Sequence, residues 1–393
     1  MINKIAKAIL IVYIYTIKED WRDVEDAVPY CNNGGVDRMT ERIKMIFVGA
    51  LTAIISLILV SMGNPANMGF CIACFLRDTA GALKLHGAAV VQYVRPEILG
   101  IVFGALVTSL VTREFAAKGG SAPLTRFIVG MCVMIGALIF LGCPLRMVLR
   151  IAGGDLNAVV GLFGFAAGIL LGIVFLNRGF SLKRTYSVSN TDGLVLPTLS
   201  LLLLMALIFY PAILAFSKEG PGSAHAPLYY ALGAGIIMGV VGYISRLCFI
   251  SGIRDAVLFR NFFMLTAFIT IIVVGAIGNI ILGRFSLGFA GQPIAHSDGL
   301  WNFLGLALVG FGSVLLGGCP FRQLILAGSG NSDSTIAVLG MVFGAAISHN
   351  FSLASSASGV TENGKIGFAI AVAVVLFIAV YNTFFNKKAG ENS

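Results

Sequence analysis

The chain has 393 residues, of which 58% are hydrophobic and 11% charged; its formal net charge is +9 and its mean hydropathy +0.93. A soluble domain usually carries about a quarter charged residues, and one soluble core of this length cannot bury so much apolar surface. The composition argues against a water-soluble enzyme, a nucleic-acid-binding protein and a disordered protein. It predicts an integral membrane protein with many spans.

The N-terminal residues 1–44 differ from the rest of the chain, because acidic residues cluster there and no segment is long enough to cross a membrane. We expect residues 1–38 to be either a cytoplasmic extension or an over-extended start upstream of Met39. Ten apolar segments follow, and each predicts a membrane-spanning helix, so the chain should have about 9–10 spans. They lie at about 46–62, 97–112, 127–142, 157–177, 194–216, 229–245, 262–282, 301–318, 335–349 and 365–385.

Ten spans place both termini on the same side of the membrane, and the charge of the loops predicts which side that is. One set of loops is rich in Lys and Arg: Arg38, Arg42, Lys44, Arg113, Lys118, Arg126, Arg178, Lys183, Arg184, Lys387 and Lys388. The opposite loops hold only Lys84, Arg95, Lys218, Arg284 and Lys365. We therefore expect a multi-pass protein of the inner (plasma) membrane with both termini in the cytoplasm.

Two signatures occur twice in the chain. The run from Cys71 to Asp78 matches the run from Cys248 to Asp255, and Gly-Cys-Pro-x-Arg occurs at 142–146 and again at 318–322. Five spans separate equivalent points, and an odd number inverts the second copy. Inverted repeats place a substrate site near the membrane midplane, at the repeat interface, as in transporters and channels.

The predicted fold is thus an all-α, polytopic integral membrane protein, built from two inverted-topology repeats of long transmembrane and short broken, re-entrant helices. Its predicted parts are the extension 1–44, membrane repeat 1 at 45–193, a linking span at 194–228, membrane repeat 2 at 229–360, and a last span with a cytoplasmic tail at 361–393.

Each signature should form a break between a long and a short helix, since Pro and the freed carbonyl groups cannot face lipid. Arginines at membrane depth are costly and tend to mark substrate paths. Four recur symmetrically: Arg77, Arg146, Arg254 and Arg322. Asp78 and Asp255 could equally make structural ion pairs with the arginines beside them, whereas no acid adjoins the other two arginines, which favours an anionic permeant.

The cysteines lie mostly inside apolar segments, which is the wrong distribution for an extracellular disulfide framework. Cys31 and Cys132 are expected to be simple apolar fillers. Four others recur at matched positions beside the breaks: Cys71, Cys143, Cys248 and Cys319. Cys74 completes a Cys-x-x-Cys that could suggest redox work or a soft metal, but Ser251 replaces it in the second copy.

Other residues suggest no further chemistry. The four histidines are scattered and predict no metal site or catalytic pair, and no cofactor is expected. Gly164/Gly168 and Gly340/Gly344, at small-x-x-x-small spacing, are expected to allow close helix packing rather than to contact a ligand.

The motifs at 67–78, 142–146, 246–249 and 318–322 resemble the YeeE/YedE family of sulfur-compound (thiosulfate) transporters, over about residues 45–385. The Cys-x-x-Cys form of the first motif is similar to the branch described as selenium transporters. The resemblance implies an hourglass-shaped inner-membrane protein in which cysteines hand an anion along; by motif these are Cys71, Cys143 and Cys319, with Cys248 as the symmetric fourth. It also implies a small cytosolic sulfur or selenium carrier of the TusA type as partner.

The sequence thus predicts a membrane transporter or channel, not an enzyme, that imports a small selenium- or sulfur-containing anion. Cysteines and arginines at the repeat interface should line its pore: Cys71, Cys74, Cys143, Cys248, Cys319, Arg77, Arg146, Arg254 and Arg322. Thiosulfate uptake is the alternative substrate assignment. A membrane thiol-disulfide oxidoreductase using Cys71 and Cys74, and a soft-metal channel, are weaker alternatives.

Overall fold

The computed structural model describes residues 35–183 and 185–385. By its internal contacts the chain divides into two units, residues 1–41 and residues 42–393, and the second unit carries every signature identified above. The expectations that concern residues 1–34, Cys31, Arg184, Lys387 and Lys388 lie outside the described residues.

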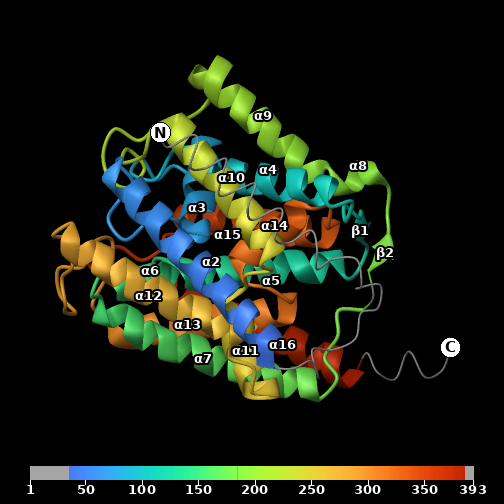
Figure 1. Ribbon diagram of the computed structural model, residues 1–393. Coiled ribbons are helices and arrows are strands. Elements are labelled where there is room, and N and C mark those ends of the chain that lie inside the picture. The colour runs from blue at the N-terminus through green and yellow to red at the C-terminus, as the bar shows by residue number, and fades with distance from the viewer. Residues whose placement is uncertain (1–34, 184, 386–393) are drawn as a thin grey trace. The chain divides into compact units, whose positions relative to one another are not determined.

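In the described part of the chain, ten long helices form the framework, and each coincides with one predicted span. They are α2 (Gly35–Ser61), α4 (Pro96–Val111), α5 (Pro123–Phe140), α7 (Leu156–Asn177), α9 (Val195–Phe209), α10 (Leu228–Ile244), α12 (Phe263–Ile281), α13 (Gly299–Leu316), α15 (Ser332–Asn350) and α16 (Glu362–Val380). The order of these helices along the chain is visible in Figure 1.

Four shorter helices follow the four signatures: α3 (Ile72–Ala82), α6 (Pro144–Ala152), α11 (Phe249–Phe259) and α14 (Pro320–Gly328). The predicted pattern of a long helix, a break and a short helix is therefore confirmed at each signature. The remaining elements are small: α8 (Asn190–Gly193), the 3-10 helix η1 (Pro211–Ile213), the π-helical turn η2 (Tyr381–Phe385), and strands β1 (Lys118–Gly119) and β2 (Tyr186–Ser187), which pair antiparallel.

Two predicted boundaries were wrong. Helix α2 begins at Gly35, not near residue 46, so the basic residues expected in a loop before it are part of the helix, and Met39 lies inside it. The linking span was expected at 194–216, but α9 ends at Phe209. Pro211 accounts for this end, because proline has no N–H to continue the helix and disfavours helical geometry in the residue before it.

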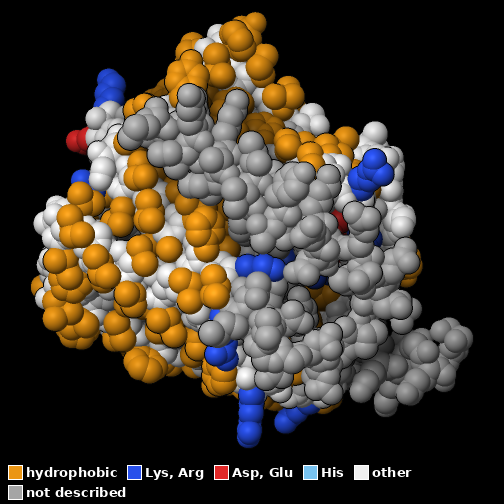
Figure 2. All heavy atoms as spheres, viewed as in Figure 1, with side chains coloured by type: hydrophobic (Ala, Val, Ile, Leu, Met, Phe, Trp, Pro, Cys, Tyr) orange, Lys and Arg blue, Asp and Glu red, His pale blue; other side chains and the backbone are white. Residues whose placement is uncertain are grey.

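The chain is an all-α, polytopic membrane protein. Within residues 35–183 and 185–385, seven helical stretches are long and apolar enough to cross a membrane, and α4 and α9 are apolar but shorter. Apolar side chains gather on the outer surfaces of α12 and α7 (Figure 2). On these helices Ile277 and Phe163, among others, are more than half exposed, as suits surfaces that face lipid.

Helices of the two halves pack in matched pairs. Helix α7 lies along α13 and, equivalently, α5 lies along α15; likewise α6 packs on α12 and α14 packs on α4. Each pair takes one helix from each repeat, so neither half buries its apolar surfaces without the other. This interlocking follows the repeat that the sequence shows.

The predicted packing role of the paired glycines is confirmed. A side-chain carbon on Gly164 or Gly168 would overlap backbone carbonyl groups of α13, and one on Gly340 or Gly344 would overlap the backbone of α5. Only a hydrogen fits at these crossings, so the helix backbones approach each other closely.

Candidate functional site

Four cysteines hold the same structural position. Each is the N-cap of a short helix and has an extended backbone conformation: Cys71 of α3, Cys143 of α6, Cys248 of α11 and Cys319 of α14. All four are buried and free of disulfide bonds. A helix N-terminus presents unpaired N–H groups and the positive end of the helix dipole, so each thiol lies where a helix favours negative charge.

In the first half, the two signatures meet at three thiols, which we call the first cluster: Cys71, Cys74 and Cys143. The Cys71 thiol hydrogen-bonds to those of Cys143 and Cys74, and its sulfur accepts the backbone N–H of Cys74 at 3.3 Å. The sulfur of Cys143 accepts the backbone N–H groups of Arg146 and Ala73. The N-termini of α3 and α6 therefore point at the same sulfur atoms.

Arg146 lies beside the first cluster and is completely buried. Its Nη1 donates to the carbonyl oxygen of Leu141 and lies 3.6 Å from the sulfur of Cys74. Its Nη2 donates to the carbonyl of Ile294 at 3.2 Å. Leu141 has a left-handed backbone (φ 62°), and this bend at the end of α5 turns its carbonyl toward the guanidinium.

The second half repeats the arrangement with one substitution, in what we call the second cluster: Cys248, Cys319 and Ser251. The Cys248 thiol hydrogen-bonds to Cys319 and to the side chain of Ser251. The sulfur of Cys319 accepts the backbone N–H groups of Arg322 and Phe249. The N-termini of α11 and α14 thus converge as those of α3 and α6 do, and the hydroxyl of Ser251 stands where the first cluster has a third thiol.

Arg322, the counterpart of Arg146, is partly exposed, and its Nη1 is buried without a hydrogen-bond partner among the described residues. It interacts electrostatically with Cys248, Cys319, Arg246 and Tyr243. The structure thus holds a guanidinium beside the second cluster that forms no ion pair with any carboxylate of the described residues.

Asp78 and Asp255 each form an ion pair with the adjacent arginine, Arg77 and Arg254. This was one of the two alternatives that the sequence left open for the aspartates. Arg77 donates to Asp78 at 2.7 Å, and both side chains are buried. Arg254 donates to Asp255 at 2.8 Å and is about one-third exposed, with its Nη2 3.5 Å from the hydroxyl of Ser251.

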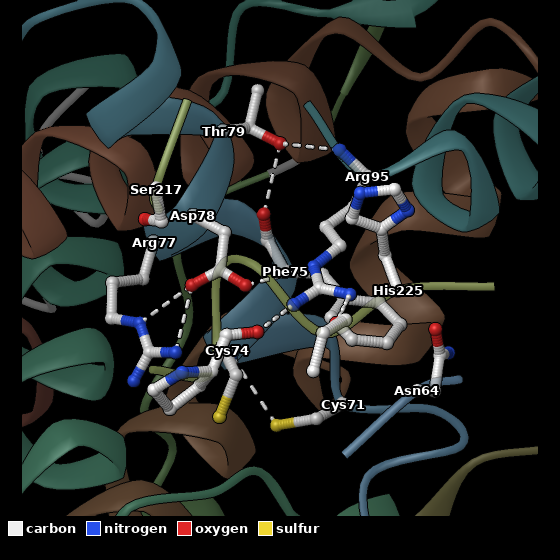
Figure 3. A network of polar contacts seen from close by, with 12 residues as sticks. Asn64, Cys71, Cys74, Phe75, Arg77, Asp78, Thr79, Arg95, Ser217 and His225 are labelled. Atoms are coloured by element: carbon white, nitrogen blue, oxygen red, sulfur yellow. Dashed lines mark hydrogen bonds and ion pairs between the residues drawn. The ribbon is translucent and has the colours of Figure 1, made fainter. Parts of the chain in front are cut away.

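Asp78 also accepts a second arginine, Arg95, at 2.8 Å (Figure 3). Arg95 lies in a loop, as expected, but it is fully buried, and it donates to the carbonyl groups of Ala224 and Pro221. This network ties α3 to the start of α4 and to the loop before α10, which is distant in sequence. Arg126 was also expected in a loop, which was wrong: it lies in α5 and pairs with Asp333 at 3.4 Å.

Arg150 is a buried residue that sequence reasoning missed. It lies one helical turn after Arg146 in α6, pairs with Asp155 at 2.6 Å, and stacks over the ring of Phe140 at 4.2 Å. The signal was available, since a second arginine four residues after the first occupies the same face of a helix. Only the fold shows that Asp155, the N-cap of α7, supplies its counter-charge.

Two of the four histidines, which are scattered along the sequence, meet in the fold. The rings of His86 and His349 stack at 4.6 Å, and His86 bonds to the carbonyl of Arg77 through Nε2 at 3.1 Å. His225 stacks on Tyr93 at 3.9 Å. Burial lowers the pKa of His86 below its ordinary value. Within the residues the structure describes, no three His, Cys, Asp or Glu side chains form a metal-binding group.

Comparison with known proteins gives one family. Residues 244–389 match the model of the family described as sulphur transport, and this segment includes the whole second cluster. The family resemblance found in the motifs is therefore confirmed over the second half of the chain. No curated protein matches the sequence.

Proposed function

We propose that this membrane protein carries a small sulfur- or selenium-containing anion across the inner membrane into the cytoplasm, with the two thiol clusters on its path. The observation that supports the proposal most directly is the pairing of four short-helix N-termini at four thiols. The match of residues 244–389 to the sulphur transport family agrees with it.

The chemistry of the clusters suits a soft anion. Backbone N–H groups and helix dipoles stabilise negative charge in a region without bulk water. A thiol is a weak donor, and a sulfur or selenium atom is a weak, polarisable acceptor, so each contact is loose enough to release the anion. Arginines offset part of the cost of removing the anion from water. A hard oxyanion such as sulfate gains less from thiols, and this difference sets selectivity.

With both termini in the cytoplasm, the breaks before α3 and α6 open toward the outside and those before α11 and α14 toward the cytoplasm. The first cluster then receives the anion, and the second cluster delivers it. Cys71, Cys143 and Cys319 are the proposed relay thiols, with Cys248 as the fourth. Delivery on the cytoplasmic side would suit a small carrier protein of the TusA type, which takes over the sulfur or selenium.

The third thiol of the first cluster bears on the choice of substrate. Cys74 adds a soft group beside Cys71 and Arg146, and its counterpart Ser251 does not. A selenium anion is softer than its sulfur analogue and gains more from an added thiol, so we place selenium anions first and thiosulfate second.

Uptake by whole cells tests the proposal. Cells that lack their own routes for sulfur and selenium anions should accumulate labelled selenite, selenide or thiosulfate when they express this chain. Sulfate serves as the hard-anion control and should not accumulate. Uptake of none of the soft anions, with the protein present at normal levels in the membrane, would overturn the proposal.

A further inference from the structure

The two halves of the chain differ in the burial of the arginine that ends the Gly-Cys-Pro-x-Arg motif. Arg146 and Arg322 occupy the same position in the same motif, four residues after the glycine at the helix break. The first is sealed inside the protein, whereas the second is partly exposed. A difference at matched positions is informative because the two helix breaks otherwise share their backbone plan.

The hydrogen-bond donors of the Arg146 guanidinium are satisfied by acceptors of the protein itself. Carbonyl oxygens of Leu141, Ile294 and Pro293 accept from it, the last two at 3.2 and 3.4 Å, and the sulfur of Cys74 lies 3.6 Å away. These acceptors come from α3, from the end of α5 and from the loop after α12. No donor of Arg146 is left over for a passing anion to use, and the side chain instead joins three segments.

Among the described residues, no such set of acceptors surrounds Arg322, and the residue next to it bonds to carbonyl groups at the break instead. Gln323 donates through Nε2 to Leu316 at 3.0 Å and to Gly318 at 3.5 Å, the carbonyls that flank the helix break. The first half has Met147 at the position of Gln323, and a thioether donates no such bond. The Nη1 of Arg322 has no hydrogen-bond partner among the residues described.

We infer that Arg322, together with Cys248, Cys319 and Ser251, binds the transported anion, and that Arg146 is a structural residue that holds the first helix break closed. This inference rests on the proposed function, and it separates an arginine that binds the anion from an arginine that stabilises the fold. A buried guanidinium donor with no partner is costly, and a bound anion would relieve that cost. Nearby Arg246 adds positive charge of the same kind.

The groups around Arg322 indicate what kind of anion fits. The guanidinium and the hydroxyl of Ser251 are hard donors suited to oxygen atoms, whereas the thiols of Cys248 and Cys319 suit a soft terminal atom. The site therefore favours an anion that carries both, such as an oxyanion with a terminal sulfur or selenium. Thiosulfate has this composition; sulfate lacks the soft atom.

Equilibrium binding of radiolabelled thiosulfate to the purified full-length protein in detergent tests the inference, together with its melting temperature. Arg322→Gln should weaken thiosulfate binding by about 10- to 100-fold, the range expected for losing a charged hydrogen bond. It should leave the melting temperature of the empty protein unchanged or raise it, because an unpaired charge is removed. Arg322→Lys should retain part of the affinity.

Arg146→Gln should show the opposite pattern: a lower melting temperature, and wild-type affinity in the folded fraction. If this variant does not fold, Arg146→Lys, which keeps the charge and loses part of the carbonyl contacts, should give the same pattern in milder form. Arg284→Gln removes an exposed arginine from the loop after α12 and should change neither measurement.

Wild-type affinity in Arg322→Gln, or lost affinity in stable Arg146→Gln, would overturn the inference while leaving transport itself intact. Sulfate competing as well as thiosulfate would overturn the assignment of the soft contacts. Failure of the wild-type protein both to bind and to take up any soft anion would instead refute the proposed function, so the two failures are distinguishable.

Discussion

Cys71 and its three counterparts show that the backbone position of a buried cysteine decides whether its thiol acts as a polar group or as a packing group. Cys132 is equally buried, but it lies in the middle of α5 and packs in an apolar cluster with Phe311 and Leu315. The N-cap cysteines instead have backbone N–H groups directed at their sulfur atoms. The same thiol is thus a packing group in one place and a polar group in the other.

Replacement of the relay thiols tests this distinction. Cys71→Ala, Cys143→Ala and Cys319→Ala should each abolish uptake of the soft anion, with normal expression and insertion, because small residues are tolerated in embedded helices. The Ser variants should lose nearly as much, since a hydroxyl is not polarisable like sulfur. Labelled-anion uptake into cells measures the effect.

Cys132→Ala is the matched control and should transport normally. If Ala at 143 or 319 also left uptake at the level of this control, those thiols would be packing residues and the relay would be refuted.

The aspartates of the first signature pair give a prediction on stability. Asp78→Asn leaves Arg77 and Arg95 buried without a counter-charge, and breaking a buried ion pair costs about 3–5 kcal/mol. Asp255→Asn, at the equivalent position, breaks a partly exposed pair, which should cost about 0–1 kcal/mol. Melting temperatures of the two purified variants provide the comparison; equal losses would contradict the assignment of Asp78 to a buried network.

At the scale of the elements, the short helices depend on the long ones for their position. Helices α6 and α14 pack against α12 and α4 of the opposite half, so a break in one repeat is held by the other repeat. The glycine crossings of α7 with α13 and of α15 with α5 set the distance between the halves. Anything that widens a crossing should therefore disturb thiol clusters that lie far from it in sequence.

Gly168→Ala tests this dependence. The added methyl group would overlap the carbonyl oxygen of Ala307, so α7 and α13 must separate, and overpacking of this kind costs about 1–3 kcal/mol. We expect a lower melting temperature and reduced uptake. Gly233→Ala on α10 is the control, because an added carbon there meets nothing within 4 Å. A Gly168 variant as stable as this control would show that the crossing tolerates side chains.

At the scale of the whole molecule, the structure changes which basic residues count toward the predicted topology. Arg95 and Arg126 are removed from the loop charges because both are buried or paired. The exposed basic residues that remain on the expected cytoplasmic side include Arg113, Lys118, Arg178, Lys183 and Arg260. The opposite loops keep Lys84, Lys218 and Arg284, whereas Lys365 lies in α16 and pairs with Glu362.

Reporter fusions should confirm this orientation. A reporter that is active only in the cytoplasm should be active after Ser393 and within the loop 178–193, and inactive within the loop 351–361, since basic loops stay in the cytoplasm. A periplasmic signal from either of the first two sites would refute both the orientation and the inversion of the repeats.

The sequence alone determined the helical class, the ten long helices, the four breaks and their repetition. These features follow from the length of the apolar segments, from the motifs that interrupt them and from the repeat, all of which can be read along the chain. It also located the thiols and arginines of the two clusters. Tertiary structure decided which charges are neutralised: Asp78 is shared with Arg95, and Arg150 finds Asp155. It decided likewise that carbonyl groups from distant segments surround Arg146 and leave Arg322 open. Pairing between charges depends on which segments fold against each other, and no local pattern specifies that.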